Sequence, residues 1–155
     1  MPNFAVSFER KISNNLKIIF MAKKSKKTKE ISLLLQQWAF DVANHLCWHC
    51  GMRQTEAFRR AYEVQRCLEA LGSGKVRLRY YKKDGTLREA VGTLCKGYSE
   101  RFDNYEYKDE PGSATSINYD LFLYWDLEED GYRSFSASRF IGFEVLENSE
   151  KYGQL

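Results

Sequence analysis

Side chains that can ligate a metal gather in one short stretch of the chain: His45, Cys47, His49 and Cys50. Thiolates and imidazoles are the groups that zinc prefers. These residues all fall on one predicted helix, however, and no second cysteine pair is present to complete a tetrahedron. Cys67 and Cys95 would have to converge on them from elsewhere. We therefore predict no metal and no cofactor, and we expect Cys47 and His49 to pack in the helix core.

Nucleophilic and acid–base chemistry are not indicated. Ser134, Ser136 and Ser138 have no histidine nearby and no glycine-containing elbow that would expose a nucleophile. The carboxylates lie in turn and loop sequences, without the pair of dissimilar environments that acid–base catalysis needs. They are Asp103, Glu106, Asp109, Glu110, Glu128, Glu129 and Asp130. We expect solvated charges, with a docking patch for a basic partner as the alternative, and we expect that the protein is not an enzyme.

Basic and aromatic side chains recur on the predicted strands and suit a polyanion. The basic ones are Arg77, Arg79, Lys82, Lys83, Arg88, Arg133 and Arg139, and the aromatic ones are Tyr81, Tyr124 and Trp125. Cations pair with phosphates, and aromatic rings stack on unpaired bases. We predict an RNA- or DNA-binding surface from the basic set with Tyr81 and Trp125. The alternative is that these cations only cover the outer faces of exposed strands.

Two strand pairs, each closed by an Asp-Gly turn, must position these groups. Val76, Leu78 and Tyr80 alternate with polar neighbours, which is typical of a half-buried strand. A turn at residues 83–85 leads to a second strand over 86–94, because Asp and Gly tolerate a positive φ. The remaining elements are an acidic loop over 96–116, a central strand over 119–126, a turn at 129–131, a fourth strand from Tyr132, a short helical turn at 136–138 and a last strand over 141–146.

The segment before the strands predicts a helix with apolar residues on two sides. One face holds Ile31, Leu34, Leu35, Trp38, Val42 and Leu46 at helical spacing. A second stripe, Leu33, Phe40 and Cys47, lies nearly opposite. A helix of this kind must be covered on both sides, so we predict that the second stripe contacts the next helix or a partner. Gly51 ends this helix.

A second helix follows, capped by Thr55 and closed by Gly72-Ser73-Gly74. Its buried face is predicted to hold Ala57, Ala61, Val64, Leu68 and Leu71. Two helices joined by a short turn suggest a DNA-binding helix-turn-helix, but Arg60 falls where that motif requires an apolar residue. A plain helical hairpin packed on the strands is the better interpretation.

Composition favours one globular domain with an uneven charge. The chain has 155 residues, 43% of them apolar, and a net charge of +3. Residues 1–30 hold eight Lys or Arg against two Glu, whereas residues 100–131 hold two against ten acidic residues. No apolar run is long enough for a membrane span, and four cysteines in a core-rich chain suggest reduced thiols. We expect a cytoplasmic protein without membrane contact.

We divide the chain into a basic leader predicted to be disordered (1–29), a helical hairpin (30–73), a barrel (74–148) and a tail (149–155). The leader contains a run of lysines at Lys23, Lys24, Lys26, Lys27 and Lys29, which would suit either a phosphate-binding arm or a solvated segment. Met21 precedes this run and is an alternative start of the protein.

The order of these motifs resembles a known group. KKDGTLREAVGTL, YWDLEEDGYRSF and SRFIGFEVLE, after the T-E-A-x-x-x-A-Y helix of residues 55–62, are similar to small SH3-like barrel proteins of unknown function from Bacteroidetes, their phages and mobile elements. The barrel also resembles the WYL domain, with Tyr124-Trp125-Asp126-Leu127, Arg133-Ser134-Phe135 and Arg139-Phe140 at the motif positions. The resemblance implies an α+β fold with a five-stranded barrel and a regulatory module that senses nucleic acid or nucleotides. No winged-helix domain precedes the barrel here, and its acidic loop is long.

Two functions follow as hypotheses. The first is a non-enzymatic barrel of a phage or mobile element that binds or senses nucleic acid. The second is a protein-interaction module, such as an anti-CRISPR-like inhibitor of a host defence complex. Leu33, Phe40, Cys47 and the acidic loop would serve the second, with a host protein or a second copy as partner.

Overall fold

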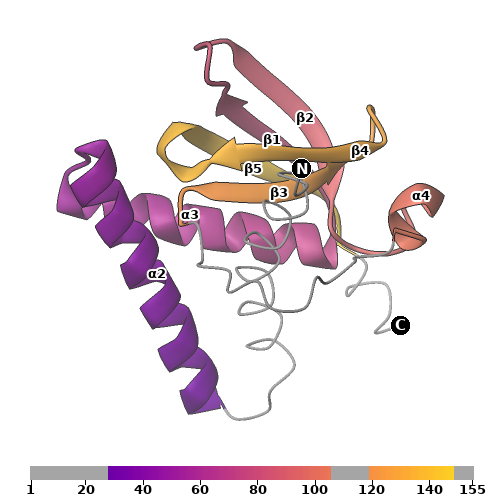
Figure 1. Ribbon diagram of the computed structural model, residues 1–155. Helices are drawn as coiled ribbons and strands as arrows, with labels where there is room; N and C mark the ends of the chain where they lie inside the picture. Colours follow the sequence, from indigo (N-terminus) through magenta and orange to yellow (C-terminus); the bar gives the residue numbers. More distant parts are fainter. Residues whose placement is uncertain (1–27, 106–118, 149–155) are drawn as a thin grey trace, which may run out of the picture.

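The computed structural model describes residues 28–105 and 119–148, with the side chains of α2 from Leu33 onward. Residues 1–27 of the predicted leader, most of the acidic loop and the predicted tail lie outside these residues. The predicted leader boundary at residue 29 is wrong by two residues, because Thr28 and Lys29 already belong to the first helix. Two helices precede five antiparallel strands, so the predicted α+β class and element order are confirmed (Figure 1). No helix in the described ranges has the length and apolar character needed to traverse a bilayer.

Among the described residues, helix α2 (Thr28–Cys50) packs on the core from Leu35 to its C-terminal part. Trp38, Val42 and Leu46 are buried, as their helical spacing predicts. Leu34 is 47% exposed, so its assignment to the buried face is wrong. The N-terminal part of α2 extends past the strands (Figure 1), so no described helix or strand covers the helical turn that contains Leu34. Gly51, with φ +68°, ends the helix as predicted because this conformation favours glycine.

Helix α3 (Gln54–Ser73) lies beneath the sheet and buries the predicted face through Ala57 and Leu68. The predicted cap at Thr55 is wrong. Arg53 occupies the N-cap position, and no side chain satisfies the first turn there. Arg60, the residue that argues against a helix-turn-helix, donates to the carbonyl oxygens of Ala137 at 3.0 Å and Ser138 at 3.2 Å. It therefore ties α3 to the turn that precedes the last strand.

The first two strands form the predicted hairpin. Strands β1 (Gly74–Tyr81) and β2 (Leu87–Thr93) pair antiparallel, and Val76, Leu78 and Tyr80 point into the core. The turn between them contains Gly85 at φ +85°, and its N–H donates to the Lys82 carbonyl at 3.0 Å. The predicted Asp-Gly turn is thus confirmed, although β1 begins at Gly74, before the predicted Val76.

The second half of the sheet follows the predicted order with small shifts. Strand β3 (Leu121–Asp126) starts after the predicted Tyr119, because Tyr119 is in a turn. Strand β4 (Gly131–Ser136), the short helix η1 (Ala137–Arg139) and β5 (Phe140–Asn148) follow. A further short helix, α4 (Glu100–Asp103), lies in the part of the acidic loop that is described.

The strand order β4-β3-β2-β1-β5 places β3 in the interior of the sheet, as its unbroken apolar run predicts. Strands β1 and β4 are separated by two strands in this order and yet contact each other, so the sheet curls into a barrel. Its interior is filled by aromatic rings, and Tyr80, Phe135 and Phe140 lie with neighbouring centroids 5.3–5.8 Å apart. Helices α2 and α3 close one side of this core (Figure 1).

Candidate functional site

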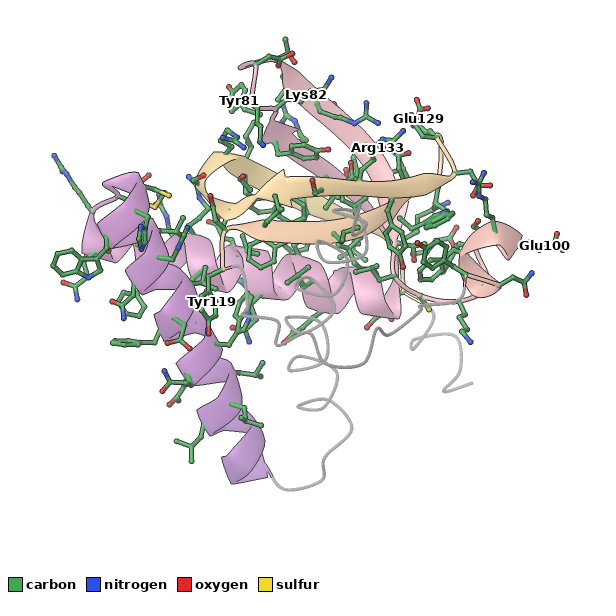
Figure 2. The ribbon with its side chains drawn as sticks, in the orientation of Figure 1. Tyr81, Lys82, Glu100, Tyr119, Glu129 and Arg133 are labelled. Carbon is green, nitrogen blue, oxygen red and sulfur yellow. The ribbon has the colours of Figure 1, made fainter. Side chains whose placement is uncertain are left out.

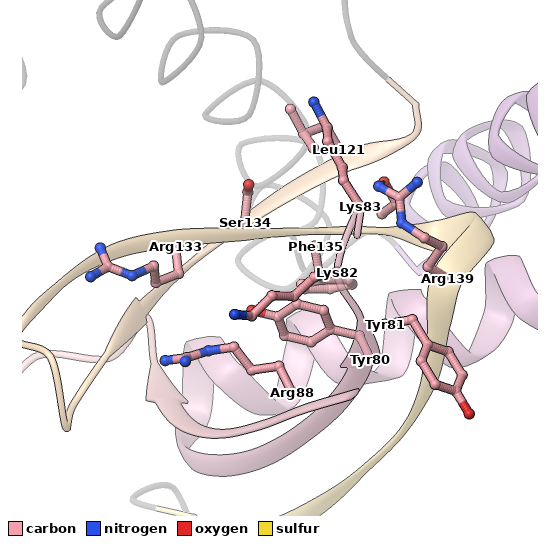
Figure 3. Close-up of a pocket in the computed structure, with 11 residues that line it drawn as sticks. Tyr80, Tyr81, Lys82, Lys83, Arg88, Leu121, Arg133, Ser134, Phe135 and Arg139 are labelled. Atoms are coloured by element: carbon pink, nitrogen blue, oxygen red, sulfur yellow. The ribbon is translucent and has the colours of Figure 1, made fainter. Parts of the chain in front are cut away.

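A cavity of about 310 Å³ opens between the β1–β2 hairpin, β4 and η1 (Figure 3). Its lining combines cations with aromatic and small polar side chains. The charged members are Lys82, Lys83, Arg88, Arg133 and Arg139. The others are Tyr80, Tyr81, Leu121, Ser134, Phe135 and Ser136. No carboxylate is among the lining residues, so the cavity has the charge pattern of an anion site.

The cations enter the cavity from separate elements. Figure 3 shows the charged ends of Lys82, Arg88 and Arg133 on one side, whereas Lys83 and Arg139 lie toward the other, and the rings of Tyr80 and Phe135 lie between them. Within the described residues, no carboxylate forms an ion pair with Lys82, Lys83 or Arg139. These cations are therefore available to an incoming anion.

Arg88 is held by a buried carboxylate. Its Nη2 donates to Asp126 Oδ2 at 2.6 Å, and Asp126 is fully buried. Burial alone would raise the pKa of this carboxyl, but hydrogen bonds from the N–H of Glu129, from Arg88 and from the N–H of Glu128 lower it below its ordinary value. The Arg88 pKa is raised, first by its bond to Asp126. Asp126 therefore orients this guanidinium and keeps it charged.

The interior beneath the cavity contains a second polar contact. The hydroxyls of Tyr80 and Tyr124 share a hydrogen bond of 2.7 Å inside the aromatic core. Burial raises the pKa of the Tyr124 hydroxyl well above its ordinary value, and the bond to Tyr80 adds to the effect. The Tyr124 phenol therefore stays neutral and acts as a fixed dipole under Arg88, which also hydrogen-bonds it.

The remaining two cavity arginines are less constrained. Arg133 donates to its neighbour's carbonyl at 2.9 Å and lies 3.9 Å from Glu129, a weak surface pair. Arg139 donates to Ser136 Oγ at 2.8 Å. The Nε atoms of Arg88 and Arg139 are buried without an acceptor in the described part of the chain, so neither guanidinium has all its donors satisfied.

Arg77 and Arg79 do not join this cavity. They line a separate hollow with Glu89, Phe143 and Glu144 on the other face of β1. Arg77 is bound to Glu144 at 3.0 Å and to Glu89 at 3.5 Å. Strand β1 places Arg77 and Arg79 on one face, as predicted, but the curled sheet directs that face away from the other cations.

Trp125 is not an exposed platform for a base. It is 1% exposed, and its Nε1 donates to Asp130 Oδ1 at 3.0 Å. Its ring packs on Phe102 at 5.4 Å, which holds α4 against the barrel (Figure 2 labels Glu100 on α4). Asp130 also accepts from Ser99 Oγ at 2.6 Å, which lowers its pKa, so it is not simply the solvated charge that its turn predicts.

Tyr81 is the predicted aromatic residue that remains at the surface, 47% exposed at the rim of the cavity (Figure 2). Its ring points outward from the other lining side chains in Figure 3.

The three residues of the predicted partner-binding stripe on α2 differ in their surroundings. Cys47 is half-buried and packs against the core, Phe40 meets Phe58 of α3 at 6.1 Å, and Leu33 is 65% exposed.

The metal-ligand stretch also differs from its prediction. All four cysteines are free thiols, and burial raises the pKa of Cys67. His49 is exposed and stacks on His45 at 4.8 Å, so its predicted core packing is wrong. Instead, His45 and Cys50 lie beside Asp120, a residue that sequence spacing does not connect with them.

Residue spacing does not identify Asp126, Tyr80 and Ser136 as parts of the cavity and its support. Asp126 belongs to the apolar strand β3. A carboxylate in a buried run needs a cationic partner, so the sequence could have predicted a buried ion pair at this position. Nothing in the sequence identifies Arg88 as that partner, since the two residues are far apart along the chain.

The fold and cavity together define a small basic-lined β-barrel carried on two helices. Residues 64–141 match the family model described as WYL_2, Sm-like SH3 beta-barrel fold. The match covers half of the chain and most of the barrel, and the chain belongs to this family. The SH3-like barrel and the WYL-like pattern predicted from the motifs are thereby confirmed. Neither the curated proteins nor the solved structures that were compared gave a match.

Proposed function

We propose that this barrel binds single-stranded nucleic acid through the cavity between β1, β4 and η1, without catalysing a reaction. The supporting observation is the lining, in which five cations and no carboxylate accompany three aromatic residues. Single strands expose both phosphates and base faces, and a groove that pairs the first and stacks the second fits this polymer. The family's barrel fold is compatible with such a sensing role, and an origin in a phage or mobile element stays a prediction.

The size of the cavity and the cations at its rim favour binding of single-stranded nucleic acid over binding of a duplex. A hollow of about 310 Å³ is at the lower end of the range for small-ligand pockets, so it can admit part of a single strand and not a double helix. Lys82, Lys83 and Arg133 line the cavity and are exposed, so they are the cations that would contact phosphates. Arg88, fixed by Asp126, presents a preoriented donor.

Charge reversal tests this proposal. A Lys82→Glu, Arg133→Glu double variant should weaken binding of a labelled single-stranded oligonucleotide at least about tenfold, since hydrogen bonds to charged groups contribute roughly 1.5–3 kcal/mol each. Fluorescence anisotropy at low salt, with RNA and DNA of the same base sequence, measures the change. Both residues are exposed, so the variant should melt as the wild type does.

Arg79→Glu is the matched control. Arg79 is exposed on β1 and lines the other hollow, so its reversal changes charge without touching the cavity. Equal losses from the control and the cavity variant would show nonspecific attraction. Binding that disappears when Lys23, Lys24, Lys26, Lys27 and Lys29 become Ala, but survives the cavity variant, would assign it to the leader and refute the proposal.

A protein-interaction role is the second candidate, and exposed apolar side chains on and beside α2 favour it. Leu33 is 65% and Trp48 is 84% exposed, and Trp48 lines a hollow with Met52 and Phe58. If the chain inhibits a host defence complex through this face, a Leu33→Glu, Trp48→Glu variant should lose inhibition in a plasmid-interference assay. The Lys82→Glu, Arg133→Glu variant should keep it. The opposite pattern would exclude this role.

A further inference from the structure

Three metal-ligand types meet where α2 ends against the start of β3. One ligand atom each from His45, Cys50 and Asp120 lies within 4.8 Å of the others. The Nε2 of His45 is 3.9 Å from Asp120 Oδ2. A tetrahedral zinc site with bonds of about 2.0–2.3 Å separates its ligand atoms by roughly 3–4 Å, so small side-chain rotations suffice to close this cluster.

The carboxylate is already oriented for such a site. Asp120 Oδ1 accepts from the backbone N–H of Ser138 in η1 at 3.2 Å, which directs the other oxygen toward His45. The residue before it, Tyr119, donates to Asp41 of α2 at 3.2 Å (Figure 2). Two elements therefore hold the Asp120 segment beside α2, and outer contacts of this kind are what orient metal ligands in proteins.

We propose that His45, Cys50 and Asp120 form a Zn²⁺ site with water as the fourth ligand. An imidazole, a thiolate and a carboxylate together match the borderline-soft character of Zn²⁺, whereas Mg²⁺ and Ca²⁺ require oxygen ligands alone. The ion would link the C-terminal end of α2 to β3, and through Ser138 to η1. This inference is independent of the nucleic-acid proposal, since none of the three ligands lines the cavity.

The site also has the access that a metal needs. Cys50 is exposed, and His45 and Asp120 are half-buried, so an ion can reach all three without opening the core. Metals bind cysteine as the thiolate, so the proton of the Cys50 thiol is released when Zn²⁺ binds.

Cobalt substitution tests the ligand set directly. Full-length protein without a polyhistidine tag is titrated with Co²⁺ under reducing conditions, and thiolate coordination produces a charge-transfer absorption band. We expect the band in the wild type and its loss in Cys50→Ser. The matched control is Cys47→Ser, on the same helix but half-buried toward the core, which should keep the band. No band in the wild type, or a band that survives Cys50→Ser, overturns the proposal.

The other two ligands are tested by competition of Zn²⁺ with a chromophoric chelator. Asp120→Asn and His45→Gln should each weaken Zn²⁺ binding by at least the roughly 10- to 100-fold that loss of an outer-shell partner costs. In the wild type, Zn²⁺ at about one hundred times its dissociation constant should raise the melting temperature by roughly 5–10 °C. Unchanged affinity in Asp120→Asn would remove β3 from the site and contradict the proposed link.

Discussion

At the scale of single residues, the Arg88–Asp126 pair is the contact on which the cavity most depends. Asp126 is the only charged residue among the buried core and buried polar groups of the described chain. Its Oδ1 accepts from the N–H groups of Glu128 at 2.9 Å and Glu129 at 3.0 Å, and its Oδ2 binds Arg88. One carboxylate thus shapes the β3–β4 turn and orients a cavity cation.

Asp126→Asn should lower stability at neutral pH by about 3 kcal/mol, because it leaves Arg88 without its buried counter-charge. The pKa of Asp126 is below its ordinary value of 3.8, so its contribution is complete above that pH and is lost as the pH falls through the folded-state pKa. Urea unfolding between pH 7 and pH 2 should therefore show the difference between wild type and variant shrinking below about pH 4.

The control for this prediction is Asp84→Asn in the exposed β1–β2 turn. Asp84 also has a lowered pKa, first through its hydrogen bond from the Thr86 hydroxyl, but an asparagine oxygen accepts the same bonds. We expect only a small change there. A difference between wild type and Asp126→Asn that stays constant down to pH 2 would show that the charge of Asp126 contributes nothing.

At the scale of elements, the junction between α3 and β1 determines how the barrel meets its helices. Thr93 Oγ1 donates to the Gly74 carbonyl at 2.6 Å, and the Leu94 N–H donates to the Leu71 carbonyl at 2.8 Å. Gly74 itself pairs with Asn148 of β5, and an added Cβ there would collide with the Glu147 carbonyl. The end of α3, β2 and β5 therefore meet at one glycine.

Gly74→Ala should destabilise the protein by about 1–3 kcal/mol, since the backbone of β5 must move to admit the methyl group. Gly142→Ala on β5 is the matched control, because its added Cβ would meet no atom within 4 Å. Its effect should stay within about 1 kcal/mol. Chemical denaturation of both variants measures the difference, and equal stabilities would show that β1 and β5 are not closely packed at Gly74.

At the scale of the whole molecule, basic and acidic residues are concentrated in different segments of the chain, and their charges largely cancel. Net charge is only +3, and residues 100–131 hold ten acidic side chains against two basic ones. Any polyanion binding by the barrel must then be local, through the few cavity cations that carboxylates do not neutralise. Such binding is sensitive to salt because each phosphate contact releases counterions.

The dependence of single-strand affinity on salt should reflect three or four phosphate contacts. With the five leader lysines changed to Ala, log K should fall with log salt at a slope of roughly −2 to −3. Adding Lys83→Glu should reduce the magnitude of the slope by at least about 0.7, the value for one contact to a single strand. A slope near zero, or one unaffected by Lys83→Glu, would show that the cavity does not bind phosphates.

The sequence by itself determined the local features of this protein. Apolar alternation gave the core face of β1, Gly51 ended α2, and the Asp-Gly turn at residues 83–85 closed the first hairpin. Each of these features depends on the conformational preference of a few neighbouring residues, and such preferences can be inferred from a single sequence. The resemblance of the motifs to a family then predicted the barrel.

Only the tertiary structure decided which residues share a site. It separated Arg77 and Arg79 from the cavity, buried Trp125 and brought Asp120 to His45 and Cys50. Strand pairing sets which neighbours meet, and curvature of the sheet sets which faces converge. Both depend on contacts between residues far apart in the chain, so the spacing of residue types does not contain them.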